Sequence, residues 1–220
     1  MRPLTCLLTL LALAANARAA GSLPTTTLVT YDAPVGNEFA VTTTLAGLSA
    51  SPLLAGNSAA TLEPGVAVPS SVFLMTAAAS PTAAAAVANQ QYFQFTVTPQ
   101  PGMTVTFDAL AFRAAKGGSA GPRGWALTTS LDGFAAIQAT ATIATTAPTF
   151  TDFQVLLPGG APIDTATVFR LYGFAPVAGN GIFFDSISLS GTLVPEPSSA
   201  VLLTLAATAA LVRRRRYWNR

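Results

Sequence analysis

The chain has 220 residues, of which 51% are hydrophobic and only 9% charged, and its formal net charge is +2. It contains no histidine and its one cysteine is Cys6. The usual general base, thiolate nucleophiles and ordinary zinc or iron–sulfur sites are therefore excluded from the rest of the chain. Residues 20–194 contain eight acidic side chains and only four basic ones. This excess of negative charge argues against a nucleic-acid partner.

Residues 1–19 have the composition of a secretory signal peptide. Arg2 supplies a positive start, an apolar run covers residues 4–15, and the small residues Ala17 and Ala19 precede the expected cleavage point. The run is shorter than the roughly 20 residues that cross a bilayer. We expect export and removal of this segment by signal peptidase, with a buried core helix as the alternative.

Residues 20–194 are predicted to form one all-β domain, because short runs rich in Thr, Val, Phe and Tyr alternate with Gly, Pro, Asn and Asp. In the run at residues 103–113, strict alternation predicts that one strand face carries Val105, Phe107, Ala109 and Ala111. This spacing favours a single β-sandwich of jelly-roll type, with an up-and-down barrel as the alternative. The predicted strands cover residues 25–31, 38–45, 91–98, 103–113, 123–130, 149–157, 165–174 and 181–193.

Residues 46–89 give the weakest pattern, being rich in Ala, Ser, Pro and Gly. Their alanine runs predict either a short helix on the sandwich or a long loop, because Pro81 interrupts them.

The last segment, residues 195–220, contains three parts in a fixed order. Pro195-Glu196-Pro197 is a stiff stretch that cannot join a helix. The apolar residues 200–212 predict a short transmembrane helix of about 20 Å. A stop-transfer cluster ends it and favours the cytoplasmic side: Arg213, Arg214, Arg215 and Arg216. The Pro-Glu-Pro segment then faces outward, where the signal peptide sends the body.

This tail resembles the PEP-CTERM sorting signal of Gram-negative bacteria. The resemblance implies an exosortase as partner, processing near Pro195-Glu196-Pro197 at the inner membrane, and delivery to the cell surface or an exopolysaccharide-containing matrix. An ordinary tail anchor is the alternative. The body also resembles those of PEP-CTERM proteins, notably in the turn at residues 130–134 (Ser-Leu-Asp-Gly-Phe) and the strand at residues 169–173 (Phe-Arg-Leu-Tyr-Gly). The expected function is that of a non-catalytic envelope or matrix protein.

Carbohydrate binding by the sandwich is the second hypothesis. Such sites use exposed aromatic rings that stack on sugars, helped by a few polar groups, and the candidates are Trp125, Arg123 and Tyr172. The alternative places these rings in the core, because strands are enriched in aromatic residues. A glycosidase, which needs two carboxylates flanking one cleft, is the remaining enzymatic hypothesis.

A structural calcium ion is the one cofactor that the sequence suggests, with Asp32 and Asp185 as candidate ligands. Strict alternation along residues 181–193 puts Asp185 on the face of Phe183, Ile187 and Leu189, where a carboxylate needs a partner. An ion pair with Arg170 is the favoured alternative to calcium.

Overall fold

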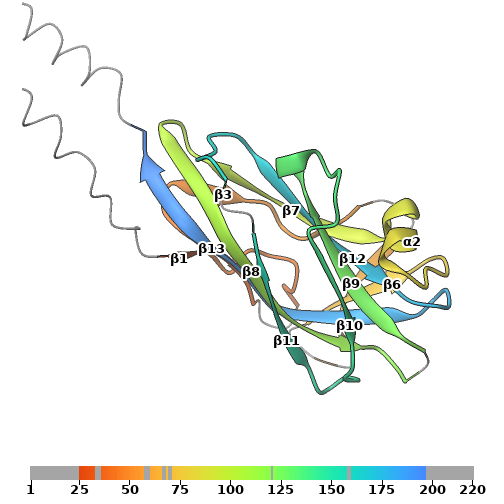
Figure 1. The fold of residues 1–220 in the computed structure, drawn as a ribbon. Coiled ribbons are helices and arrows are strands. Elements are labelled where there is room, and N and C mark those ends of the chain that lie inside the picture. Colours follow the sequence, from red (N-terminus) through yellow and green to blue (C-terminus); the bar gives the residue numbers. More distant parts are fainter. Residues whose placement is uncertain are drawn as a thin grey trace, which may run out of the picture.

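The computed structural model describes residues 25–32, 36–56, 60–65, 68, 71–119, 121–157 and 160–196. In this part of the chain, two antiparallel sheets pack as a β-sandwich (Figure 1), which confirms the all-β prediction. The predicted signal peptide (residues 1–19) and the tail from Pro197 onward lie outside the described residues.

The first sheet, called sheet A below, is built around its two longest strands, β8 (Met103–Lys116) and β13 (Gly181–Pro195), which pair along most of their length. On the far side of β8 lies β11, and on the far side of β13 lie β1 and then β2. One end of β13 also pairs with β6, which pairs with β5. The flanking strands are β11 (Thr151–Leu156), β1 (Thr26–Tyr31), β2 (Thr43–Thr44), β6 (Val72–Thr76) and β5 (Ala60–Pro64).

The second sheet, called sheet B, has the order β10-β9-β12-β7-β3, with β4 also paired to β7. Its strands are β10 (Ala139–Ile143), β9 (Arg123–Thr129), β12 (Thr167–Phe174), β7 (Tyr92–Pro99), β3 (Leu48–Ala50) and β4 (Leu54–Ala55). From β7 onward the chain passes repeatedly between the sheets, so neighbours in sequence are often in different layers. This connectivity differs from that of an up-and-down barrel.

The core between the sheets is dominated by phenylalanine. Phe95 and Phe169 of sheet B stack with ring centroids 5.1 Å apart, and Phe93 meets Phe184 of sheet A edge-on at 5.1 Å. All four rings are at most 1% exposed. The inner faces of the two sheets supply most of this core, and loop residues such as Leu53 complete it.

The region between residues 36 and 91 departs most from expectation. The predicted strand 38–45 is wrong: the chain turns there, with the Ala40 N–H donating to the Asn37 carbonyl at 3.1 Å, and only β2 is extended. The second alanine run forms the helix α2 (Ala83–Ala88), whose first turn is capped by the Thr82 hydroxyl. This helix lies on the outer face of sheet B (Figure 1), where Ala86 is fully buried.

A β-bulge corrects the predicted faces of β8. Asp108 is an extra residue between the pairs Phe107–Gly191 and Ala109–Ser190. The alternation therefore changes phase, and Leu110 and Phe112 join Val105 and Phe107 in the core. Ala111 and Arg113 face outward instead, contrary to the predicted grouping of Ala111 with Val105.

A second bulge does the same in β13. Ser186, at a positive φ of 49°, lies in the register shift between the pairs Asp185–Arg113 and Ser188–Ala111. Ile187 and Leu189 consequently point into the core. Asp185 is left on the outer face, so the prediction that it shares a face with Ile187 and Leu189 is wrong.

Candidate functional site

The Pro-Glu-Pro segment begins inside the folded domain. Pro195 is the last residue of β13 and lies opposite Met103, and the Glu196 N–H donates to the Gly102 carbonyl at 2.8 Å. The sandwich thus extends one residue past its predicted end at 194. Pro197, the apolar residues 200–212 and Arg213 to Arg216 lie outside the described residues. Within the described ranges, no helix is long and apolar enough to cross a membrane.

The three predicted sugar-contact residues, Trp125, Arg123 and Tyr172, are each 3% exposed. Trp125 points between the sheets, with its ring centroid 4.9 Å from that of Phe112 and 5.2 Å from that of Phe153. A buried ring has no face left for a sugar, so the placement of these residues contradicts their predicted role as a stacking surface.

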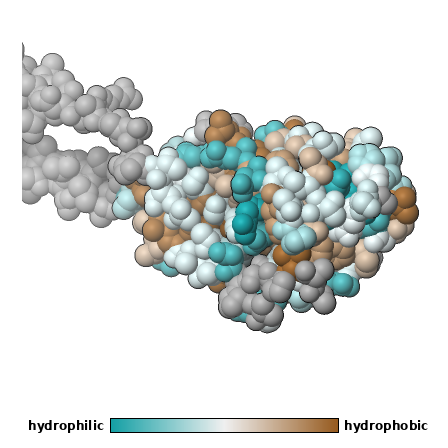
Figure 2. Space-filling model, turned by 90° about the horizontal axis from the view of Figure 1, so that it is seen from below, coloured by the Kyte–Doolittle hydropathy of each residue, from teal (hydrophilic) through white to brown (hydrophobic). Residues whose placement is uncertain are grey.

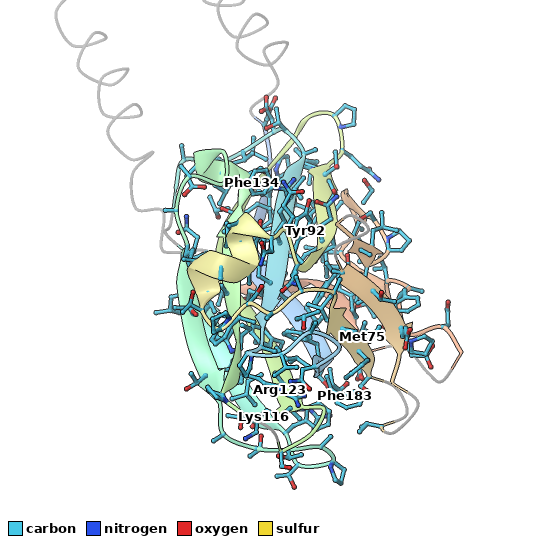
Figure 3. The ribbon with its side chains drawn as sticks, turned by 90° about the vertical axis from the view of Figure 1, so that its right-hand side faces the viewer. Met75, Tyr92, Lys116, Arg123, Phe134 and Phe183 are labelled. Carbon is cyan, nitrogen blue, oxygen red and sulfur yellow. The ribbon has the colours of Figure 1, made fainter. Side chains whose placement is uncertain are left out.

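Arg123 lies at one end of the sandwich, near Lys116 and Phe183 (Figure 3), and its side chain is hydrogen-bonded to a neighbouring loop. Its guanidinium donates to the Gly181 carbonyl at 2.8 Å and to Asn180 Oδ1 at 2.9 Å. Burial lowers the pKa of Arg123, although a guanidinium stays protonated at any physiological pH. Arg123 therefore joins the start of β9 to the loop before β13.

Tyr172 lies beneath α2, with its ring 4.9 Å from that of Tyr92. Next to this pair, the Arg170 guanidinium lies 4.6 Å from the Tyr92 ring and 3.7 Å from the Phe134 ring. The Ser130 hydroxyl accepts from the Val168 N–H at 2.9 Å. The Ser-Leu-Asp-Gly-Phe turn thus packs on the Phe-Arg-Leu-Tyr-Gly strand, which gives both motifs a structural role.

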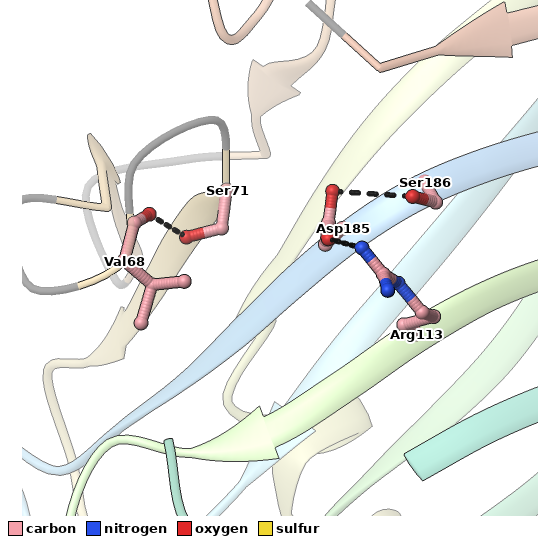
Figure 4. Close-up of polar contacts among 5 residues, drawn as sticks. All are labelled: Val68, Ser71, Arg113, Asp185 and Ser186. Atoms are coloured by element: carbon pink, nitrogen blue, oxygen red, sulfur yellow. Dashed lines mark hydrogen bonds and ion pairs between the residues drawn. The ribbon is translucent and has the colours of Figure 1, made fainter. Parts of the chain in front are cut away.

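Asp185 is paired with Arg113 on β8 (Figure 4), not with the predicted Arg170. Its other oxygen accepts from the Ser186 hydroxyl at 3.3 Å. Asp32 is exposed just beyond the last residue of β1. Among the described residues, no three acidic, histidine or cysteine side chains are grouped as metal ligands. Calcium binding at Asp32 and Asp185 stays a prediction, and in the structure Asp185 is engaged by Arg113 instead.

The arrangement around Arg113 opens onto a groove of about 630 Å³ on the outer face of sheet A. The two bulges create this groove, because they turn Ala111 and Arg113 outward on β8 and place Ser186 at the surface of β13. The edge strand β11 supplies the far wall. The lining residues are Ala111, Phe112, Arg113, Asp152, Phe153, Gln154 and Ser186. Figure 2, seen from the side on which β10 and β11 lie in Figure 1, shows a hydrophilic band between more neutral surfaces.

The pairing register of the strands determines which charged side chains are neighbours in this groove. Arg113 lies opposite Asp152 on β11 and opposite Asp185 on β13, so one cation stands between two carboxylates. The backbones of the two aspartates are about 10 Å apart, two strand spacings, and a glycosidase would need its two carboxylates on either side of an open cleft. Here the arginine occupies the row between them and holds Asp185, where a glycosidase would leave room for substrate and water.

The next row across the same face is uncharged. Gln154 of β11 lies opposite Ala111, Ala111 opposite Ser188, and Ser188 opposite Thr30 of β1. Thr30 and Thr43 of β2 share a hydrogen bond of 2.6 Å between their hydroxyls. Beyond Gln154, small and hydroxyl-bearing side chains thus form a row that is about 19 Å long over its four strand spacings.

A second hollow of about 430 Å³ lies at the loops around the 3₁₀ turn η1 (Ser130–Asp132). Its main polar group, Asp132, accepts from the Ala136 N–H at 3.1 Å and from the Gln138 side chain at 2.8 Å. These internal bonds shape the turn and engage one oxygen of the Asp132 carboxylate.

No family model matches this chain, and no curated protein matches it. Among solved structures, a family 29 carbohydrate-binding module mutant complexed with mannohexaose has a TM-score of 0.37 at 12% identity, over 76% of this chain and 93% of that one. Another family 29 module, from Piromyces equi, has a TM-score of 0.40 at 8% identity, over 77% and 93%. The cleaved adhesin domain of Lys-gingipain from Porphyromonas gingivalis has 0.40 at 12%, over 76% and 99%. At these values the likenesses carry no argument about what this chain does.

Proposed function

We propose that this chain is an exported, non-catalytic protein of the cell surface or extracellular matrix whose jelly-roll-type sandwich binds extracellular polysaccharide. The observation that carries the binding part is the polar groove on the outer face of sheet A. It combines a guanidinium (Arg113), a carboxylate (Asp152), an amide (Gln154) and a hydroxyl (Ser186) on one sheet face. On the neighbouring strands, a row of small residues lies beside it.

This set of groups suits sugar hydroxyls, each of which both donates and accepts hydrogen bonds. Asp152 and the Gln154 carbonyl accept, whereas Arg113 and the Gln154 amide donate. A shallow, open groove accommodates the middle of a long chain as readily as its end, which suits a polymer. The absence of histidine and of any cysteine beyond Cys6 supports binding rather than catalysis.

Binding is tested by affinity electrophoresis of the purified full-length chain in gels containing the host's own polysaccharide. Asp152→Ala and Gln154→Ala are expected to weaken retardation, each by up to about tenfold for the loss of one or two hydrogen bonds. The matched controls Asp164→Ala and Gln100→Ala change the same residue types at exposed positions outside the groove and should bind normally. Equal binding by all four variants would exclude the groove as the polysaccharide-binding site.

Export and sorting form the other half of the proposal. The signal-peptide composition of residues 1–19 supports secretion. The sequence order of the three parts of the tail supports anchoring in the inner membrane and processing by an exosortase near Pro195-Glu196-Pro197. The pairing of β1 with β13 supports it too, because Thr26 lies opposite Gly191. Both ends of the domain therefore leave from the same end of the sandwich, where one membrane can hold the signal peptide and the tail.

Intact-mass measurement of the protein recovered from envelope and medium of its native host tests this half. A mass that starts near residue 20 and ends near residues 195–197 is expected. A mass that retains Arg213 to Arg216 would instead indicate a simple tail anchor, and an intact chain in the cytoplasm would contradict export altogether.

A further inference from the structure

The basic side chains of the described domain are almost all engaged. Across the described ranges there are nine acidic residues against four basic ones. Arg123 is buried among backbone and Asn180, Arg170 lies against two aromatic rings, and Arg113 is paired with Asp185. Lys116, half-buried, is the fourth, and it lies three residues beyond Arg113, about 10 Å along β8.

The groove itself repeats this imbalance. Its single guanidinium stands in register between Asp152 and Asp185, and Asp185 is only 9% exposed while the Arg113 side chain is 47% exposed. An anionic ligand that captured Arg113 would leave a nearly buried carboxylate without its cation, which is costly. It would also approach the exposed carboxylate of Asp152, and like charges placed together oppose binding.

We infer that the polysaccharide recognised at this groove is uncharged or amine-bearing, and that chains carrying uronate, sulfate or phosphate groups are rejected. This inference rests on the proposed binding function and adds the chemical class of the ligand. Asp152 has the selective role: it accepts from hydroxyls or ammonium groups and repels anions. Asp185 acts through Arg113, which it holds in place and whose charge it neutralises.

The experiment compares polysaccharides that share a backbone and differ in charge. The full-length chain, with Arg213 to Arg216 replaced by glutamine so that the tail adds no cations, is titrated in detergent with hydroxyethyl cellulose, dextran, their carboxymethyl derivatives, and chitosan. At about 10 mM salt, where screening reaches only about 30 Å, a carboxymethyl derivative is expected to bind at least fivefold more weakly than its neutral parent. Near 1 M salt, where the screening length is about 3 Å, the difference should largely disappear.

Asp152→Asn keeps the planar side chain and removes its charge, so it should narrow the neutral-to-anionic affinity ratio at least threefold, whereas Asp164→Asn should leave the ratio unchanged. A carboxymethyl derivative that binds as well as its parent, or an unchanged ratio in Asp152→Asn, overturns the inference but leaves polysaccharide binding intact. Binding to none of these chains or to the host's own polysaccharide would overturn the proposed function itself.

Discussion

Trp125 separates a structural role from a binding role more cleanly than any other residue of the described domain. The structure buries its ring between the sheets, against Phe112 and Phe153. Truncation to alanine removes the transfer energy of the indole and leaves a cavity, for which buried aromatic residues typically cost about 3–5 kcal/mol. The two edge-on ring contacts contribute about 0.5–1.5 kcal/mol each within such a total.

We therefore expect Trp125→Ala to lower the melting temperature by roughly 6–20 °C, at about 2–4 °C per kcal/mol for a domain of this size. Trp125→Phe should cost much less, since it keeps a ring in the cavity and removes an indole N–H that has no acceptor among the described residues. Thermal unfolding followed by circular dichroism measures both. Below its transition, Trp125→Ala should still bind polysaccharide through the groove.

A Trp125→Ala protein with unchanged melting temperature and abolished binding would refute this reasoning. That outcome would mean that the ring is exposed and contacts the ligand, as the sequence alone suggested. A protein that is destabilised and also fails to bind at low temperature, where it is folded by circular dichroism, would place the binding site near β9 rather than on the outer face of sheet A.

Three further perturbations follow from the same structure. Arg113→Gln should lower the free energy of unfolding in urea by about 1–3 kcal/mol, because it leaves Asp185 nearly buried and unpaired. Asp185→Asn should cost less than about 1 kcal/mol, since Arg113 is half exposed and can be hydrated. A larger loss of stability in Asp185→Asn than in Arg113→Gln would contradict the assigned burial. Gly124→Ala should cost about 1–3 kcal/mol, because an added Cβ overlaps the Ala141 carbonyl oxygen and the Phe174 ring, and an unchanged unfolding midpoint would show that the strands can separate there. Burial raises the pKa of Tyr31, so stability that is present below about pH 10 should be lost as the pH rises above the pKa of an unfolded tyrosine. The stability of Tyr31→Phe should therefore fall less steeply with alkaline pH than that of the unmodified protein. Equal slopes of stability against pH for the two proteins would mean that the phenol is hydrated.

Much of the strand pattern was predictable because alternation and turn residues are local properties. The runs at residues 91–98, 103–113 and 181–193 correspond to β7, β8 and β13, each within a few residues. The run at 38–45 failed because its apolar residues pack on the core from a loop: Phe39, Val41 and Leu45 all contact the core cluster without forming a continuous strand. Hydrophobicity there reflects burial and not extended backbone.

The candidate site was harder to predict, because it depends on two bulges and on a partner distant in sequence. A local sign of the first bulge exists: apolar residues change phase between Phe107 and Leu110, which strict alternation from Val105 overlooks. Nothing local distinguishes Arg113 from Arg170 as the partner of Asp185, since only the register of β8 against β13 decides it. The burial of Trp125 likewise depends on Phe112 and Phe153, both on the opposite sheet.

The position of β13 has a mechanical consequence. Its last residue, Pro195, is still paired with Met103, and the strand runs between β8 and β1 in the middle of sheet A. If the tail is anchored while a polymer bound at the groove is pulled, the load acts along β13 and shears it against its neighbours. Many backbone hydrogen bonds must then break together instead of one after another. With the proposed anchoring, the central position of β13 would therefore make the domain resist pulling along this strand.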